Sequence, residues 1–314
     1  MSHSELEPSG RSAAPQGREP LEQYIADVSR WVTAALSQSI PEQWDVPQVL
    51  RESMEYSLQA GGKRLRPLLV TAACEALGGS RDAALPVAAA IEMVHTYSLI
   101  HDDLPAMDND DYRRGKLTNH KVFGEAMAIL AGDSLLTHAF YSVVQASRKH
   151  GVPAERVLSI VEDLAEMAGP RGMVGGQVAD MEGEQGMTDL QQLQYIHLHK
   201  TGDLMIFSLL AGGRIAGADE GQLAALHRFG TQIGLAFQIQ DDILDLVGDE
   251  SKLGKTGSDL KQQKVTYPYF IGLEASLAEV KQLTAAAHLA ILKGGFNDPS
   301  RLLEIADYLM SRDH

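Results

Sequence analysis

Apolar side chains return every three or four positions from Leu21 to the carboxyl end of the chain, which is the spacing of one face of an α-helix. The segment that begins at Pro153 is typical, because its apolar residues share a face until Gly169 and Pro170 end the run. No Asn-Gly or Asp-Gly turn stands between runs of alternating apolar residues, as a β-hairpin would require. We therefore predict an all-α protein of about ten to thirteen helices.

The helical pattern continues without a visible boundary. No change of composition and no long linker divides residues 21–314, so we predict a single large helical bundle domain over this range. Residues 1–20 are rich in Ser, Pro, Gly and Glu and cannot bury enough apolar surface to order themselves, which predicts a flexible tail. The single cysteine, Cys74, lies among apolar residues and is expected in the core.

Composition excludes several classes of function. The 314 residues include 27 Lys and Arg against 42 Asp and Glu, a formal net charge of −15, which argues against a nucleic-acid binder. No apolar run approaches the roughly 18 residues that span a bilayer, so no stable membrane insertion is expected. The amino terminus lacks a charged start followed by an apolar block, and a cytoplasmic enzyme is the default.

An apolar helical segment that runs into paired aspartates occurs twice, as MVHTYSLIHDDLPAMDNDD and as AFQIQDDILDLVGD. In the second, Asp241 and Asp245 are four residues apart and share a helix face with Gln238. Two carboxylates at that spacing repel each other, and the repulsion grows among apolar neighbours. A divalent cation would relieve the repulsion.

The first segment places five aspartates within ten residues, beginning with Asp102 and Asp103. This pair comes at the carboxyl side of an apolar helix, where the helix dipole disfavours negative charge. One such cluster alone would most simply be a solvated helix end, but two of the same form indicate a shared role. Carboxylates without nearby Cys or His sets favour Mg²⁺, which completes its coordination with water and substrate phosphates.

Basic residues gather beside both clusters, which suits a phosphate-bearing substrate because Arg and Lys both bind phosphate. Any one of them alone is more simply a solvated surface charge. Together they are Lys63, Arg64, Arg66, Arg113, Arg114, Lys200, Lys255 and Lys264.

Two glycines interrupt a helical pattern near the middle of the chain. Gly175 and Gly176 most simply allow another helix to approach closely. Gln177 and Asp180, one turn apart on the same segment, could face a cavity or solvent with equal ease.

Six motifs together resemble the trans-isoprenyl diphosphate synthases, specifically the bacterial-type farnesyl diphosphate synthases: DDLPAMD, DDILD, GGKRLRP, DYRRGKLTNH, HKTGD and FQIQDD. The resemblance implies an all-α fold of the isoprenoid synthase type with a deep central apolar cavity, usually in a homodimer. It also implies a Mg²⁺-dependent prenyltransferase that joins isopentenyl diphosphate to dimethylallyl and then geranyl diphosphate. The expected product is (E,E)-farnesyl diphosphate.

The resemblance also assigns metal ligands. Asp102 and Asp108 would hold two Mg²⁺ ions, with Asp103 as a supporting carboxylate. Asp241 would hold a third, supported by Asp245, and Mn²⁺ is an alternative ion.

The remaining assigned residues contact substrate. Those that would neutralise the allylic diphosphate are Arg113, Lys200, Lys255 and Lys264. Those that would bind the diphosphate of isopentenyl diphosphate are Lys63, Arg66, His95 and Arg114. Those that would stabilise the allylic carbocation are Gln238, Thr201 and the main-chain carbonyl near Lys200.

Tyr97 is expected to set the product length. It lies five residues before Asp102, about 7.5 Å away along the helix axis. In the family an aromatic residue there blocks the growing tail, and Tyr97 next to the small Ser98 resembles the bacterial farnesyl synthases. If Tyr97 is ordinary packing instead, a geranylgeranyl diphosphate synthase becomes the alternative.

Two further alternatives remain. A non-catalytic regulatory subunit would keep the fold but has no need of the two aspartate motifs. A terpene cyclase fits less well, because Lys63, Arg66 and His95 imply a second diphosphate site.

Overall fold

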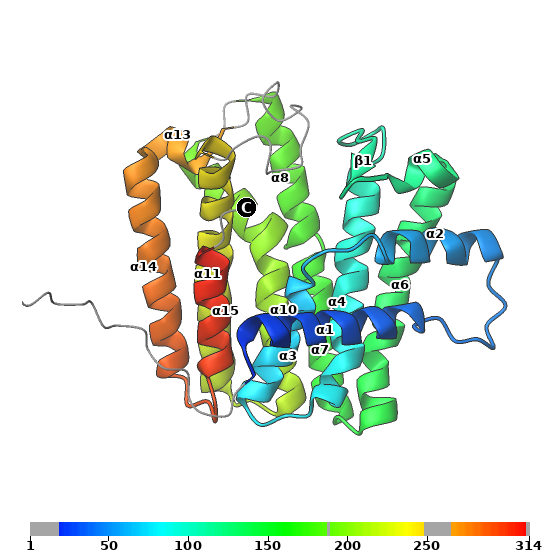
Figure 1. Cartoon of the computed structure of the whole chain (residues 1–314), viewed down its shortest axis with the longest axis horizontal. Helices are drawn as coiled ribbons and strands as arrows, with labels where there is room; N and C mark the ends of the chain where they lie inside the picture. The colour runs from blue at the N-terminus through cyan, green and yellow to red at the C-terminus, as the bar shows by residue number, and fades with distance from the viewer. Residues whose placement is uncertain (1–18, 187–188, 248–264, 312–314) are drawn as a thin grey trace, which may run out of the picture.

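The computed structural model describes residues 19–186, 189–247 and 265–311, and helices dominate it (Figure 1). Two short strands form one antiparallel hairpin, and a π-helix interrupts the α-helical pattern. The elements are α1 (Leu21–Ser37), α2 (Gln48–Leu58), α3 (Leu65–Ala76), α4 (Arg81–Asp102), β1 (Tyr112–Arg113), β2 (Lys116–Leu117), α5 (Asn119–Phe123), α6 (Glu125–His150), α7 (Ala154–Ala168), α8 (Met173–Gln185), α9 (Leu190–Ile196), η1 (His197–Gly202), α10 (Asp203–Ala216), α11 (Glu220–Val247), α13 (Tyr267–Ile271), α14 (Leu273–Leu292) and α15 (Ser300–Met310).

The all-α prediction is confirmed. The described ranges hold fourteen α-helices, slightly more than expected, because α5, α9 and α13 are only five to seven residues long and too short to show a periodic pattern. Most of the predicted tail, and the two lysines Lys255 and Lys264, lie outside the described residues. Their predicted roles therefore stay predictions.

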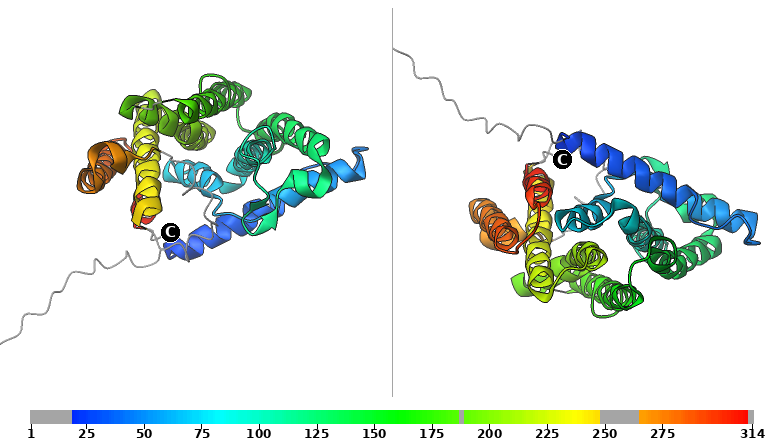
Figure 2. Two further views of the ribbon diagram at one scale, coloured as in Figure 1. Left: turned by 90° about the horizontal axis from the view of Figure 1, so that it is seen from above. Right: turned by 90° about the horizontal axis from the view of Figure 1, so that it is seen from below.

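Helices α4 and α10 form the interior of the bundle. Nearly every residue of α10 is buried, as expected for a helix that is apolar on all sides. It packs against α3, α7 and α11, whereas α4 packs against α3 and α6. Helix α1 runs across one side of this bundle, and α14 covers α11 on another (Figure 2).

Helices α4 and α11 end at the same end of the bundle, next to β1 and α13 respectively (Figure 1). Because each aspartate cluster comes at or near the carboxyl end of its helix, the fold brings both clusters to that end. Cys74 is fully buried on α3, as predicted, and burial raises the pKa of its thiol to about 12.

The hairpin of β1 and β2 was not expected from the sequence. Tyr112 pairs with Leu117 and Arg113 with Lys116. The two turn residues, Arg114 and Gly115, have positive φ angles of 52° and 75°, the conformation of a type I′ turn. Such turns favour Asn-Gly or Asp-Gly, so an Arg-Gly turn between two-residue strands leaves no recognisable pattern.

Two helices, α4 and α6, are long and apolar enough by length and composition to cross a membrane, which corrects the expectation that no such segment exists. The apolar window of α4 is 78% buried inside the protein, so its hydropathy is that of a core helix. That of α6 is only 44% buried. Part of its apolar surface therefore faces outward.

Gly212 is predicted to be essential for the contact between α10 and α3. A Cβ there would overlap the carbonyl oxygen of Val70 and lie 2.9 Å from the Cβ of Ala73, so backbone would have to move. We expect Gly212→Ala to lower the free energy of unfolding by about 2 kcal/mol, measured by urea denaturation. Gly221→Ala is the control, since Gly221 is exposed in the first turn of α11, and its change should stay within about 1 kcal/mol. Equal effects of the two substitutions would contradict the prediction.

Candidate active site

The first aspartate cluster forms a closed turn at the end of α4. The backbone N–H of Asp108 donates to the carbonyl of Asp102 over 2.8 Å, and that of Asn109 donates to Leu104 over 3.1 Å. Asn109 has a φ of 54°, a left-handed conformation that Asn tolerates better than most residues. The six-residue spacing of Asp102 and Asp108 therefore folds back and brings the two aspartates together.

Asp102 lies in an environment that disfavours its charge. The pKa of its carboxyl is raised to about 6, chiefly by burial and also by the carboxylates of Asp108 and Asp103, while Lys200 and Arg113 oppose the shift. A bound cation would relieve the same desolvation and repulsion. The oxygen donors of Asp102 and Asp108 thus suit a hard divalent ion.

Asp103 binds an arginine, unlike Asp102 and Asp108, which are the predicted metal ligands. Its side chain is buried, and it accepts hydrogen bonds from Nε of Arg113 at 2.7 Å and from Nη2 at 2.6 Å. Arg113 also lies 3.7 Å from Asp110. In this arrangement Asp103 orients Arg113, and its predicted support of a metal stays a prediction.

The second cluster lies in the last turns of α11. Thr201 donates its hydroxyl to Oε1 of Gln238 over 3.1 Å, and Nε2 of Gln238 donates to Oδ2 of Asp241 over 3.3 Å. Asp245 lies one turn further on and is exposed. The hydrogen bonds join three of the predicted residues into one chain that links η1 to α11.

Asp242 has a structural role that sequence analysis missed. Its Oδ2 accepts the backbone N–H of Tyr267 at 2.7 Å and lies 3.5 Å from Nε2 of His197. Tyr267 begins α13 and in turn accepts a hydrogen bond from Gln194 on α9. Asp242 therefore ties α11 to α13 and η1.

Lys200 lies on the π-helix η1, whose wider turn is often found at functional sites. Its Nζ forms an ion pair with Asp180 on α8 at 2.5 Å, and its charge lowers the pKa of Asp102. Helix α8 can approach because Gly176 has no side chain: a Cβ there would lie 2.7 Å from Cα of Lys200. Sequence analysis left Asp180 open, and only this pairing, twenty residues apart, reveals its role.

A second group of cations surrounds the loop before α3. Arg66 has a buried Nε with no hydrogen-bond partner, and desolvation lowers the pKa of its guanidinium to about 10. The pKa of His95 lies well below its usual range, because of burial and then the charges of Arg66 and Arg114. An anion between these residues would satisfy the orphaned donor and offset the charge.

Arg64 does not join that group, although the sequence placed it among the basic residues beside the clusters. It has a left-handed φ of 47°, and its buried guanidinium donates to Glu92 at 2.6 Å and to the carbonyl of Leu58 at 2.5 Å. Glu92, on α4, was missed by sequence analysis because nothing in its local context marks it as paired. The ion pair fixes the loop that carries Lys63 and leads into α3, on which Arg66 lies.

Arg114 reaches the same loop from the hairpin. Its guanidinium donates to the carbonyl of Gly61 and lies against Gly62, whose φ is 126°. A Cβ at Gly62 would be 2.8 Å from the Cζ atom of Arg114. The two glycines of GGKRLRP therefore provide both the unusual backbone and the space for Arg114.

Tyr97 lies one turn before His101 on α4 and is 7% exposed. Burial, with the charge of Asp102 next, raises the pKa of its hydroxyl to about 12, so it is uncharged at neutral pH. Its neighbour Ser98 donates its hydroxyl to the carbonyl of His95 over 2.9 Å. The role of Tyr97 as a floor stays a prediction.

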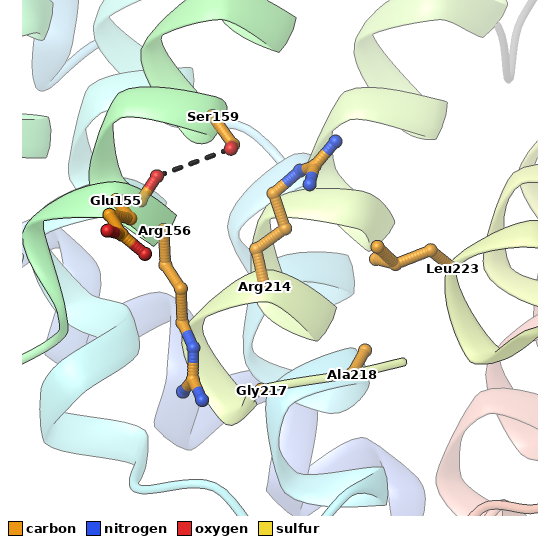
Figure 3. Close-up of a pocket in the computed structure, with 7 residues that line it drawn as sticks. All are labelled: Glu155, Arg156, Ser159, Arg214, Gly217, Ala218 and Leu223. Atoms are coloured by element: carbon orange, nitrogen blue, oxygen red, sulfur yellow. Dashed lines mark hydrogen bonds between the residues drawn. The ribbon is translucent and has the colours of Figure 1, made fainter. Parts of the chain in front are cut away.

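Two cavities are described, and neither is the predicted deep apolar cavity, which stays a prediction. One, of about 30 Å³, lies between α2, α4 and the hairpin. The other, of about 150 Å³, lies where α7 begins and α10 ends, and its two arginines, Arg156 and Arg214, point apart (Figure 3). Arg214 is paired with Asp163, and none of the residues that line this cavity is one that the sequence predicted for the site.

Comparison with known proteins gives the class of the protein. The family model described as polyprenyl synthetase matches residues 47–294. The chain belongs to this family of prenyl synthases, which are generally metal-dependent enzymes, and the resemblance drawn from its motifs is confirmed.

Individual relatives support the same assignment. The chain is 50% identical over 295 residues to a farnesyl diphosphate synthase of Geobacillus stearothermophilus, covering 94% of this chain and 98% of the relative. It is 46% identical over 293 residues to a geranylgeranyl diphosphate synthase of Cyanophora paradoxa, covering 93% and 96%. A crystal structure of an FPP/GFPP synthase from Zymomonas mobilis, in its apo form, has a TM-score of 0.82 at 36% identity and covers 93% of this chain and 99% of that one. The protein is a prenyltransferase of isoprenoid synthesis that acts on isoprenoid diphosphates.

The raised pKa of Asp102 predicts how the metal-free protein responds to pH. Folding raises this pKa from 3.8 to about 6, so the folded state holds the proton more tightly than the unfolded state between these values. The contribution of Asp102 to stability is therefore favourable at low pH and is lost as pH rises through 6. Without divalent ions, Asp102→Asn should gain about 2 kcal/mol relative to the wild type between pH 4 and pH 7.5, measured by denaturant titration.

A difference that stays the same at both pH values would contradict this prediction. Asp45→Asn, in an exposed loop, controls for the loss of one negative charge.

Proposed function

We propose that the protein is a farnesyl diphosphate synthase that condenses isopentenyl diphosphate with dimethylallyl and then geranyl diphosphate by ionisation, condensation and elimination. The observation that carries this proposal is the placement of two aspartate clusters at one end of the bundle, linked through η1. A separate group of cations lies beside the first cluster. One site would use aspartate-bound metal and would hold the allylic diphosphate, which leaves. The other would use cationic side chains and would hold the diphosphate of isopentenyl diphosphate, which is retained.

The aspartates would hold the metal at the first site. Asp102 and Asp108 from one side and Asp241 with Asp245 from the other would bind Mg²⁺, three ions in all, or Mn²⁺ as an alternative. Mg²⁺ held by a few carboxylates completes its coordination with substrate phosphate and water. When bound, the metal supplies Lewis-acid stabilisation of the departing diphosphate.

The protein's own cations complete that site. Arg113, oriented by Asp103, and Lys200, held by Asp180, are already immobilised and need little reorganisation when diphosphate binds. Lys255 and Lys264 are proposed to join them. Thr201, Gln238 and the main-chain carbonyl near Lys200 present oxygen dipoles that stabilise the allylic cation, while apolar helix faces exclude water.

The second site binds isopentenyl diphosphate. Lys63, Arg66, His95 and Arg114 surround it, and the unpartnered Nε of Arg66 is the donor that the diphosphate would satisfy. The depressed pKa of His95 makes it a neutral hydrogen-bonding group there. A terpene cyclase would have no use for this second group of cations.

Tyr97 is proposed to stop elongation at fifteen carbons. It is buried on α4, one turn and a half before Asp102, where a growing chain would meet its ring. The alternative is the longer product geranylgeranyl diphosphate, because a relative that is 46% identical is named as a geranylgeranyl diphosphate synthase.

Product analysis tests the proposal. Purified protein incubated with Mg²⁺, isopentenyl diphosphate and dimethylallyl diphosphate should give mainly a fifteen-carbon alcohol after hydrolysis, identified by mass spectrometry, and none after chelation. Asp241→Asn should lower kcat by about 10²-fold or more, because one metal position is lost. A twenty-carbon product from the wild type would contradict the role of Tyr97, and no product from folded protein would favour a regulatory subunit.

A homodimer is proposed through α6 and its neighbours. Helix α6 is only 44% buried in its apolar window, and the exposed apolar residues of β2, α5 and α6 are Leu117, Val122, Ile129, Leu130 and Val144. An apolar surface of this kind marks an interaction site. The cytoplasm stays the predicted location.

Sedimentation analysis tests the dimer. Leu130→Glu should weaken dimerisation by about 100-fold or more, because it would bury an unpaired charge. Leu292→Glu is the matched control, since Leu292 is 63% exposed at the far end of α14 and should leave the dimer intact. A monomeric wild type would contradict the proposal.

A further inference from the structure

The ring of Tyr97 rests against a neighbour on its own helix. His101 lies four residues later on α4, and the two rings meet edge to face with their centroids 5.7 Å apart and their planes at 76°. This is a favourable aromatic geometry. The orientation of Tyr97 therefore depends on where the His101 ring lies.

His101 is held in turn by α6. Its Nε2–H donates to the backbone carbonyl of Ile129 over 3.2 Å, and the exposed carboxylate of Asp133 is 4.0 Å away. A carbonyl acceptor requires the proton on Nε2, so the hydrogen bond fixes the tautomer as well as the ring position.

The ring fits there because residue 132 is glycine. A Cβ at Gly132 would overlap Nε2 of His101 and lie 2.6 Å and 2.9 Å from its Cδ2 and Cε1 atoms. Gly132 lies inside α6, two turns from its start, where glycine disfavours the helix by about 1 kcal/mol relative to Ala. Its presence is explained by the space that His101 needs.

We infer that His101 and Gly132 are positioning residues for Tyr97 and thereby determine where chain elongation stops. The inference rests on the proposed function, because it assumes that Tyr97 forms the floor. A tyrosine on a helix can adopt more than one staggered χ1. While the His101 ring lies against Gly132, the edge-to-face contact stabilises the observed orientation of Tyr97. If the His101 ring is displaced, that contact is lost and Tyr97 can adopt another χ1 rotamer.

Product length separates this role from simple packing. We expect His101→Ala and Gly132→Ala each to raise the ratio of twenty-carbon to fifteen-carbon product by about tenfold, with the KM for isopentenyl diphosphate unchanged within about twofold. Asp133→Asn is the matched control: it is adjacent on α6, exposed and isosteric, and should leave the ratio as in the wild type. The double variant His101→Ala/Gly132→Ala gives the new Cβ room, so it should fold well and still make the longer product.

Tyr97→Ala completes the experiment. In that background, His101→Ala should add no further change to the product ratio, because the ring that it positions is absent. A wild-type ratio in His101→Ala, together with a longer product from Tyr97→Ala, would overturn the inference and leave the floor intact. A wild-type ratio in Tyr97→Ala would overturn both, and absence of any prenyl product from the wild type would refute the proposed function itself.

Discussion

The ion pair between Arg64 and Glu92 is the interaction on which the arrangement of the site depends. Both side chains are 3% exposed, so neither charge is solvated and each requires the other. The pair joins the glycine-rich loop before α3 to the middle of α4. It also holds Arg64 in a left-handed backbone conformation, which is unfavourable for a residue other than glycine. Loss of either partner would leave a buried charge and free the loop that carries Lys63 and leads into α3.

Helix α4 links the substrate sites through its own geometry. Glu92 anchors the loop, His95 faces the same group of cations one turn later, and Tyr97 and Asp102 follow. Since a helix rises 1.5 Å per residue, sequence spacing fixes the distances along the axis between the proposed isopentenyl site, the proposed floor and the proposed first metal position. The burial of α4 on nearly all sides keeps this spacing rigid.

Sequence patterns predicted the parts of the site that are local. Asp102 and Asp241 could be found because each ends an apolar helical pattern, and α4 and α11 keep that pattern over many turns. The partners of these residues could not be found in the same way: Asp180 meets Lys200, and Glu92 meets Arg64, only after distant helices pack. The hairpin escaped notice for another reason, since its strands are two residues long and its turn lacks the usual Asn or Asp.

Arg113 and Arg114 are consecutive residues, yet one contacts the acidic turn after α4 and the other the loop before α3. Arg113 ends β1, whereas Arg114 is the first turn residue and has a left-handed φ of 52°, so the two side chains diverge. A single peptide unit, about 3.8 Å between Cα atoms, therefore spans the two proposed anion sites. The hairpin thus links the acidic turn after α4 to the loop before α3. In the proposed function, any shift of the hairpin would move a cation of each diphosphate site at the same time.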